Sequence, residues 1–463
     1  MTLLSHVYAE ACGNGYGDAA GYGYGDGAEV GAGHAELREA MARAVLPPAF
    51  DTAWRRHLLP RPWFVREEEV RSFARDLDGL FDLLVSLPER LFGGDAERYA
   101  KELGLDPRHA ALLRRSAEGR PARLGRADAY HDGSRYRLLE FNLGSEVGGM
   151  DMAVCNAALL RVGAFGGFAA EHGLAYEDTA ALLAADLRER ARPVLAGGAT
   201  EPVIGLIEGN GAVAAYGTLM RAFQEAMAAQ GLDLRIGEVG QLRTRPDGKL
   251  SLDGAALDLV LRNFGASQLL DDPAGEAAAE QLFRAHDAGR TVLFTSLESG
   301  LFAHKNALGM LSDPRHADAF DAAERALVDR VLPWSRPLGG GAPAELLDLC
   351  RERREHLILK PGAGHGGLDT VVGWECTDAE WRAALAVAAE RGCLAQERVV
   401  PRPEPVPDPV TGRSEEWIAA LGFFLTSRGY AGAHARANRA DGGAIVGMSS
   451  NPDTRMACVF THA

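Results

Sequence analysis

The chain has 463 residues, 47% of them hydrophobic and 24% charged, which is an ordinary globular composition with length for roughly two to four domains. A formal net charge of −15 argues against a nucleic-acid partner, because such binding depends on a basic surface. The six cysteines are scattered without a C-x-x-C pair, so we expect buried free thiols rather than disulfides or a zinc site. We see no secretion signal and no apolar stretch of membrane-spanning length, and we therefore expect a cytoplasmic protein with no membrane partner.

The first segment, residues 1–33, is expected to be a flexible arm, because residues 13–33 consist largely of glycine and tyrosine. Glycine increases the conformational entropy of the chain, and such a segment has too few large apolar side chains to build a core. A loop that lies over a substrate is the alternative interpretation.

Residues 34–200 are predicted to combine a helical segment, up to about residue 120, with a β-hairpin over 122–143. Apolar residues at three- and four-residue spacing predict a helix over 67–87. Asp132-Gly133 is a typical hairpin turn between the two strands. A further helix is expected to begin near Asp151.

Residues 201–300 are predicted to form a small parallel α/β domain. Apolar strands alternate there with a helix that ends at a glycine, which is typical of a parallel sheet. The expected strands are VIGLIE, LRIGEV, LDLVLRNF and TVLFTSL, and the helix is AVAAYGTLMRAFQEAMAAQG.

Residues 301–463 are predicted to begin with helices and to end with a hairpin over 417–439. Between them, residues 356–374 read as strand, glycine loop and strand. The remaining elements are helices over 303–333, 343–354 and 378–391, a strand over 394–400 and a proline-rich loop over 401–416.

The hairpin over 122–143 carries the first group of candidate functional residues. Glu140 and Asn142 are two residues apart on one strand, so their side chains share a face, and the turn brings Asp128 close to them. Three oxygen-bearing side chains on one sheet face suit Mg²⁺. Arg126 shares the face of Asp128 and could pair with a phosphate. The alternative is a solvated strand face that carries these groups by chance.

A second group surrounds Lys360, which an apolar strand delivers to the mouth of a glycine-rich loop. Glycines allow backbone N–H groups to approach phosphate oxygens closely, and the lysine adds a positive charge. A tight turn with an incidental lysine is the alternative. The loop glycines are Gly362, Gly364, Gly366 and Gly367.

Two weaker signals accompany these groups. Lys305, in the pair His304-Lys305, begins a predicted helix and could reach nucleotide phosphates, although a lysine in a first turn is usually only solvated. Gln396 and Glu397 end a predicted strand and could offer backbone groups and a carboxylate to adenine or ribose, or could belong to an ordinary edge strand.

Together the four groups resemble the glutathionylspermidine synthase-like, circularly permuted ATP-grasp ligases over roughly residues 120–440. That family has an R-x-D about a dozen residues before an E-x-N, then an H-K that opens a helix and an L-K-P before a glycine loop. Arg126, Asp128, Glu140 and Asn142 match the first two motifs. His304-Lys305 and 359–361 match the others.

The resemblance implies an α/β (α+β) fold of the ATP-grasp type, circularly permuted, with a small parallel α/β pre-grasp region and a helical N-terminal part. It further implies a carboxylate–amine ligase that uses ATP and Mg²⁺, passes through an acyl phosphate and releases ADP. The expected partners are small-molecule or peptide carboxylates and amines. Oligomeric state stays open.

By the same resemblance, each candidate residue receives a role. Mg²⁺ would be bound by Asp128, Glu140 and Asn142, and Lys305 and Lys360 would offset the charge of the ATP phosphates. Catalytic contacts to the transferring phosphoryl group would come from Arg126 and Arg436. The loop glycines and Gln396-Glu397 would complete the ATP site.

This sequence departs from the family in two places. His365 stands where the family's loop often carries an arginine, and the segment after Asn142 reads LGSEVGG rather than the family's common D-T-P. We therefore carry over the reaction type and not the glutathionylspermidine substrate.

Two other functions fit parts of the sequence. The glycine turn at 209–214 follows a strand and opens a helix, and Glu238 ends the next strand, as in an NAD(P)-dependent oxidoreductase. That alternative leaves the 126–142 group and Lys360 without a role. A non-catalytic ATP-grasp relative is the second alternative.

Overall fold

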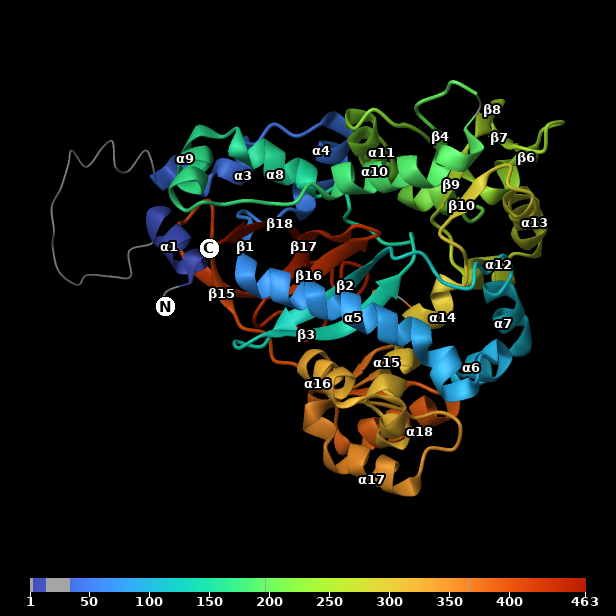
Figure 1. Ribbon diagram of the computed structural model, residues 1–463. Coiled ribbons are helices and arrows are strands. Elements are labelled where there is room, and N and C mark those ends of the chain that lie inside the picture. The colour runs from blue at the N-terminus through green and yellow to red at the C-terminus, as the bar shows by residue number, and fades with distance from the viewer. Residues whose placement is uncertain (1–2, 14–33, 196, 365) are drawn as a thin grey trace, which may run out of the picture.

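The computed structural model describes residues 3–13, 34–195, 197–364 and 366–463. Most of the segment predicted as a flexible arm, and the loop position 365, therefore lie outside the described residues. The described part of that segment differs from the prediction, because Leu4–Ala11 form a helix that buries Leu4 and Tyr8. Figure 1 shows a central sheet with a helix-covered parallel sheet at one end and a smaller lobe, built from residues after about 305, below it.

The central sheet holds the predicted hairpin and strands from both ends of the chain. Its strand order is β1-β18-β17-β16-β2-β3, with β15 paired to β16, and every pairing is antiparallel except that of β1 with β18. The strands are β1 (Trp63–Arg66), β2 (Gly125–His131), β3 (Tyr136–Leu143), β15 (Glu404–Pro407), β16 (Ser414–Thr426), β17 (Gly429–Arg439) and β18 (Arg455–His462). Both predicted hairpins, 122–143 and 417–439, are confirmed.

Helices cover this sheet and supply most of its core. The long helix α5 (Glu67–Phe92) crosses one face, in agreement with the predicted helix, and buries an apolar stripe that includes Phe73, Leu77 and Leu84. The helical interpretation of residues 34–120 was wrong at β1, a four-residue strand that pairs with β18. Other helices of this part are α1 (Leu4–Ala11), α3 (Ala40–Arg43), α4 (Pro48–Trp54), α6 (Ala96–Glu102), α7 (Pro107–Leu113), α8 (Ala153–Leu160) and α9 (Gly163–Glu171).

The second sheet is parallel, with the order β10-β9-β4-β5, as the alternation of strands and helices predicted. Side chains of α10 and α11 pack on one face, and those of α13 pack on the other. The elements are α10 (Thr179–Ala191), β4 (Val203–Glu208), α11 (Ala212–Ala229), β5 (Asp233–Glu238), β9 (Leu259–Arg262), α12 (Ala266–Asp271), α13 (Pro273–Asp287), β10 (Val292–Phe294) and α14 (Ser299–Ala303). A small antiparallel sheet, β6 (Arg243–Thr244), β7 (Leu250–Leu252) and β8 (Ala255–Leu257), adjoins them.

The smaller lobe contains an antiparallel sheet with the order β11-β14-β12-β13. Strand, glycine loop and strand follow one another over 357–372, as predicted. The predicted strand 394–400 ends earlier, at Glu397, and the predicted proline-rich loop contains β15. The elements are α15 (Lys305–Ser312), α16 (Ala322–Val331), β11 (Ser335–Pro337), α17 (Ala344–Glu352), β12 (Leu357–Lys360), β13 (Val371–Val372), α18 (Asp378–Arg391) and β14 (Leu394–Glu397).

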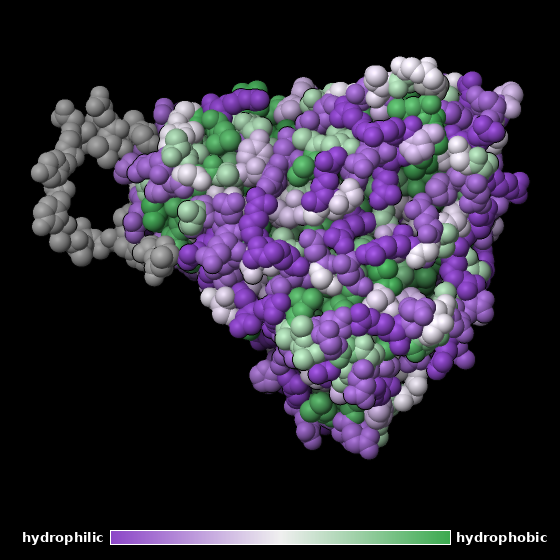
Figure 2. All heavy atoms as spheres, viewed as in Figure 1, coloured by the Kyte–Doolittle hydropathy of each residue, from purple (hydrophilic) through white to green (hydrophobic). Residues whose placement is uncertain are grey.

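The surface and the cysteines match what the composition predicts. Figure 2 shows a face that is mostly hydrophilic, with hydrophobic residues in separate groups. All six cysteines are free, and all but Cys376 are buried. Among the described residues no single helix is long and apolar enough to cross a membrane, although α8 and α9, bent by 98°, pass that test as a pair.

Candidate functional site

The β2–β3 hairpin brings the first group of candidates together on one sheet face. Asp128 lies directly opposite Glu140, and Arg126 opposite Asn142. The turn after β2 is held by the Asp132 carboxylate, which accepts hydrogen bonds from the backbone N–H groups of residues 134 and 135. The local turn chemistry thus sets the register that makes these four side chains neighbours.

Asp128 is enclosed by two arginines. Its carboxylate, 2% exposed, accepts two hydrogen bonds from Arg126, at 2.7 and 2.9 Å, and lies 2.8 Å from Nη2 of Arg436. Burial raises the pKa of Asp128, but the positive charges of both arginines outweigh burial and hold that pKa well below its usual range. Asp128 is therefore ionised and fixes the direction of both guanidinium groups.

Glu140 and Asn142 lie beside this charged group and are linked to Lys305. The Asn142 amide donates hydrogen bonds to Asp128 at 3.1 Å and to Glu140 at 3.2 Å. The other oxygen of Glu140 lies 3.3 Å from Nζ of Lys305. Lys305 also donates to the carbonyl of Gly364, so one ammonium group joins β3 to the glycine loop.

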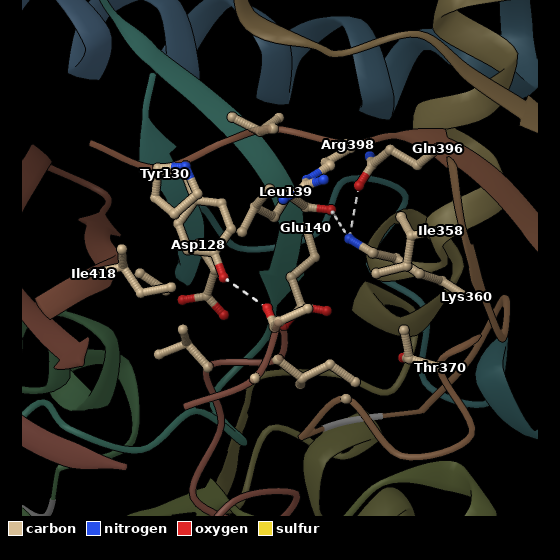
Figure 3. A pocket seen from close by; sticks show the side chains of 18 of the residues that line it. Asp128, Tyr130, Leu139, Glu140, Ile358, Lys360, Thr370, Gln396, Arg398 and Ile418 are labelled. Atoms are coloured by element: carbon tan, nitrogen blue, oxygen red, sulfur yellow. Dashed lines mark hydrogen bonds between the residues drawn. The ribbon is translucent and has the colours of Figure 1, made fainter. Parts of the chain in front are cut away.

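Lys360 reaches the same place from the smaller lobe. Its ammonium donates to the Gln396 side chain at 2.6 Å and to the carbonyl of Leu139 at 3.1 Å. Burial lowers the pKa of Lys360 to about 8, against the opposing effect of Glu140. Figure 3 shows Lys360 and Gln396 on one side of the pocket, Asp128 on the other, and Glu140 between them.

The glycine loop after Lys360 closes over Lys305. The Gly362 carbonyl accepts a hydrogen bond from the Lys305 backbone N–H, and a side chain at Gly362 would collide with the His304 ring. Gly364, Gly366 and Gly367 have φ values of +125°, +66° and +73°, which favour glycine. Glycine is therefore required here for backbone conformation and close approach.

Most of these groups line one cavity of about 530 Å³ between the central sheet and the sheet of the smaller lobe. They are Asp128, Glu140, Lys305, Lys360, Gly364, Gly366 and Gly367. The central sheet contributes polar residues such as Arg436, while Ile358, Leu139 and Ile418 provide apolar surface. The volume and mixed lining are those of a small-molecule site. Thus the β2–β3 hairpin and the strands β12 and β14, more than 200 residues later, converge on one cavity.

Gln396 and Glu397 have partners that sequence reasoning did not identify. The Gln396 side chain is buried between Lys360 and Ser335, to which it donates a hydrogen bond at 3.1 Å. The Glu397 carboxylate accepts from Arg353 at 2.6 Å and lines the cavity. Gln396 therefore orients a lysine with its side chain and leaves only backbone groups for a ligand.

The donor set suits Mg²⁺ chemically, because two carboxylates and an amide provide hard oxygen ligands and nucleotide phosphates commonly provide the rest. Both Asp128 oxygens are engaged by arginines, so Glu140 is the more available carboxylate. No group of three or more His, Cys, Asp and Glu side chains with metal-site geometry occurs in the described part of the chain. The expected site therefore depends on the Asn142 amide as its third ligand.

The glycine turn at 209–211 is already engaged by the chain itself. The Glu238 carboxylate accepts a hydrogen bond at 2.9 Å from the backbone N–H of Val213, in the first turn of α11. A dinucleotide would place its negatively charged pyrophosphate at this helix N-terminus. Asn210 is likewise bound, to Asp272 and to the N–H of Gly240. This arrangement disfavours the oxidoreductase alternative.

His434 is a buried neighbour of the two site arginines that sequence reasoning missed. It lies on β17 two residues before Arg436, opposite Gly422 of β16, which in turn pairs with Asp128. Its ring is buried, and burial, together with Arg126 and Arg436, keeps the pKa of His434 well below its usual range. The alternation of polar residues at 434, 436 and 438 within an apolar strand was the available signal.

Comparison with known proteins identifies a fold. A scan of protein-family models and a search of curated proteins find no match to this chain. Among solved structures, the chain is similar to a glutathione synthetase-like effector from Globodera pallida, with a TM-score of 0.55 and 13% identity. The match covers 87% of this chain and 90% of that one, so nearly the whole chain shares the mixed α/β fold of a glutathione synthetase-like protein.

Proposed function

We propose that the chain is an ATP-dependent, ADP-forming carboxylate–amine ligase with a circularly permuted ATP-grasp arrangement. One observation carries the proposal: the Asp128 and Glu140 carboxylates line a single cavity together with Lys305 and Lys360, and the Asn142 amide is bonded to both carboxylates. Oxygen ligands and lysine ammonium groups within one cavity are what a magnesium–nucleotide complex requires. The glutathione synthetase-like fold supports the same class of reaction by analogy.

The reaction would proceed in two steps. A carboxylate oxygen of the first substrate attacks the γ-phosphorus of ATP, forming an O–P bond while the bond to the β-phosphate oxygen breaks and ADP leaves. The nitrogen of a neutral amine then attacks the acyl carbon. A C–N bond forms, the C–O bond to the phosphate breaks, and the proton released from nitrogen passes to the departing phosphate.

In this proposal the protein acts by positioning and by charge. Lys305 and Lys360 offset the negative charge of the phosphates. Arg436 lines the cavity and would contact the transferring group, and Arg126 helps Asp128 to hold Arg436 in place. Mg²⁺, bound by Glu140 and Asn142 with Asp128 beside them, would supply further positive charge to the phosphates.

The direct test is ADP release by the purified chain with ATP, Mg²⁺ and a panel of carboxylates and amines. ADP that appears only when both an acid and an amine are present supports the ligase. Glu140→Ala and Lys360→Ala should each lower that rate by at least about a hundredfold. The exposed residues Glu355 and Lys101 provide the controls Glu355→Ala and Lys101→Ala, which should leave it unchanged.

Three results would reject the proposal. Undiminished ADP release in both folded site variants would show that the cavity is not the site of reaction. Oxidation of NAD(P)H without ADP would favour the oxidoreductase instead. ATP binding without turnover under every substrate pair would support the non-catalytic alternative.

A further inference from the structure

A second cavity, of about 670 Å³, opens beside the first. The two cavities share Lys305, Ala363 and Gly364 as lining residues, and Asn142 lines the second one. A molecule in the second cavity therefore adjoins a molecule in the first at the lysine-bearing glycine loop. Its volume suits a small organic ligand, for which roughly 300–1,000 Å³ is usual.

The second cavity lies at the carboxyl ends of the parallel strands. Glu208 ends β4, and Asn263 directly follows β9, and both line the cavity. Open parallel sheets bind ligands at this edge, because the loops that leave the strands diverge there. Further walls come from α11 and from residues 142–151, a segment that begins at the candidate ligand Asn142.

One wall of this cavity is apolar although it is accessible. Tyr216, Leu219, Met220 and Phe223 of α11 follow one another at three- and four-residue spacing, so they form one stripe, and all four line the cavity. Tyr216 is 51% exposed and Leu219 39% exposed, which is unusual for large apolar side chains. An accessible apolar stripe inside a cavity is typical of a ligand contact surface.

Two buried carboxylates on other walls lack a positively charged partner. Asp151, 3% exposed, accepts a hydrogen bond from the Trp54 indole at 3.0 Å, and Glu208, 5% exposed, accepts one from Asn263 at 2.6 Å. Neither forms an ion pair with a described Lys, Arg or His. Burial raises the pKa of both groups, that of Asp151 to about 6.

The other charged groups of the cavity are already paired. Glu146 forms an ion pair with the fully buried Arg262. Lys305 is the one Lys or Arg among the described lining residues, and it is bound to Glu140 and to the carbonyl of Gly364. Of the ligand charges available, a positive one fits best, because buried carboxylates are stabilised by a cation.

We propose that the second cavity binds the amine substrate, and that this amine is an ammonium-bearing molecule with an apolar body. The Asp151 and Glu208 carboxylates take the ammonium group, and the α11 stripe packs against the apolar part. The identity of the ligand as a substrate rests on the proposed ligase function, whereas the binding itself does not.

The test measures binding to the full chain at neutral pH without nucleotide, by calorimetry. The probes are phenethylammonium and hexylammonium, with 2-phenylethanol and 3-phenylpropionate as neutral and anionic analogues of the first. We expect at least one ammonium probe to bind, and both analogues to bind at least about tenfold more weakly. Asp151→Asn and Glu208→Gln, which keep a hydrogen-bond acceptor, should each weaken ammonium binding by about tenfold or more.

Glu298→Gln is the matched control. Glu298 is also buried, at 8% exposure, and accepts a hydrogen bond from the Glu118 N–H, but it does not line this cavity. Ammonium binding should be unchanged in this variant. Circular dichroism of each variant establishes whether it is folded, and if Asp151→Asn and Glu208→Gln both unfold, the comparison of probes on the unaltered chain decides.

Three outcomes would overturn the inference. The first is that 3-phenylpropionate binds as tightly as phenethylammonium. The second is that neither ammonium probe binds at concentrations up to about 10 mM. The third is that Asp151→Asn and Glu208→Gln are both folded and bind the ammonium probes as tightly as the unaltered chain. Ammonium binding without any ADP release would leave this inference standing and reject the ligase. Substrate-dependent ADP release together with equal binding of the ammonium and carboxylate probes would reject this inference and leave the ligase standing.

Discussion

Replacement of Asp128 by asparagine should destabilise the fold, because one buried carboxylate neutralises two arginines. The three contacts are between 2.7 and 2.9 Å long, and the carboxylate is 2% exposed. Breaking a buried ion pair by removing one partner typically costs about 3–5 kcal/mol. The side chains of Arg126 and Arg436 retain 12% and 14% exposure, so water partly solvates them and we expect the lower end, about 3 kcal/mol.

The same loss can be expressed as a shift in melting temperature. At about 2.1 cal/mol/K per residue, a chain of 463 residues has an unfolding entropy of about 1 kcal/mol/K, so the shift should be about 3 °C. Scanning calorimetry and urea unfolding would measure it. The control is Asp348→Asn, which removes an exposed carboxylate paired with Arg351 and should change little. A melting temperature of Asp128→Asn within about 1 °C of the unaltered chain would refute the reasoning.

The pH dependence of this difference provides a second readout. The folded pKa of Asp128 lies below the unfolded value of 3.8, so its stabilising effect is present above that value and is lost as pH falls through the folded pKa. The difference in free energy of unfolding between the unaltered chain and Asp128→Asn should stay constant near neutral pH and become smaller below about pH 4. A difference in free energy of unfolding that grows on acidification would contradict the assignment of Asp128 as an ionised partner.

Three further predictions concern the surroundings of the site. Arg262→Gln removes a fully buried guanidinium that contacts Glu146 and the backbone of Thr295. It should lower the free energy of unfolding, measured with urea, by about 3–5 kcal/mol. The exposed control Arg284→Gln should lower it by less than about 1 kcal/mol. Gly422→Ala would place a Cβ 2.7 Å from Cδ of Arg126, so substrate-dependent ADP release should fall about tenfold or more. Gly167→Ala is the control, because a Cβ there meets nothing within 4 Å, and it should leave the rate unchanged. Equal rates of ADP release in the two variants would contradict this prediction. Nucleotide affinity should decline as pH rises through about 8, because Lys360 then loses the charge that opposes the phosphates. Calorimetry with a non-hydrolysable ATP analogue measures this pH dependence. If the affinity of Lys360→Met still falls over the same pH range, a group other than Lys360 is responsible.

Elements with strong local signals could be predicted from the sequence. Helix 378–391 is bounded by a capping box between Thr377 and Glu380 and by Gly392 in the left-handed conformation, and its predicted limits agree with the structure. The hairpin over 125–143 follows from its Asp-Gly turn. These features depend on neighbouring residues alone, so they can be read along the chain.

Elements defined by distant partners could not be predicted in this way. Strand β1 is only four residues long and pairs with β18 almost 400 residues later, which no local pattern reveals. Strand β15 contains two prolines, which usually indicate a loop, but it pairs with β16 at the edge of the described sheet and buries Glu404 against Arg61. Non-local pairing overrode local preference in both cases.

The candidate site shows the same division. The spacing of Glu140 and Asn142 predicted their common face, because alternation along a strand is a local property. That Arg436 of β17 binds Asp128 of β2, and that the Gln396 side chain of β14 turns to Lys360 of β12, depends on contacts between separate strands of each sheet. These side-chain partners can be identified only from the three-dimensional arrangement of the strands.

The position of the β2–β3 hairpin within the central sheet has a consequence for synthesis on the ribosome. Ala129 of β2 pairs with Leu421 of β16, so the hairpin emerges roughly 300 residues before its second neighbour exists. Until then one of its edges has no strand to receive its backbone N–H and carbonyl groups. The high contact order implies slow folding, and newly made chains would depend on protection from edge-to-edge association until translation nears completion.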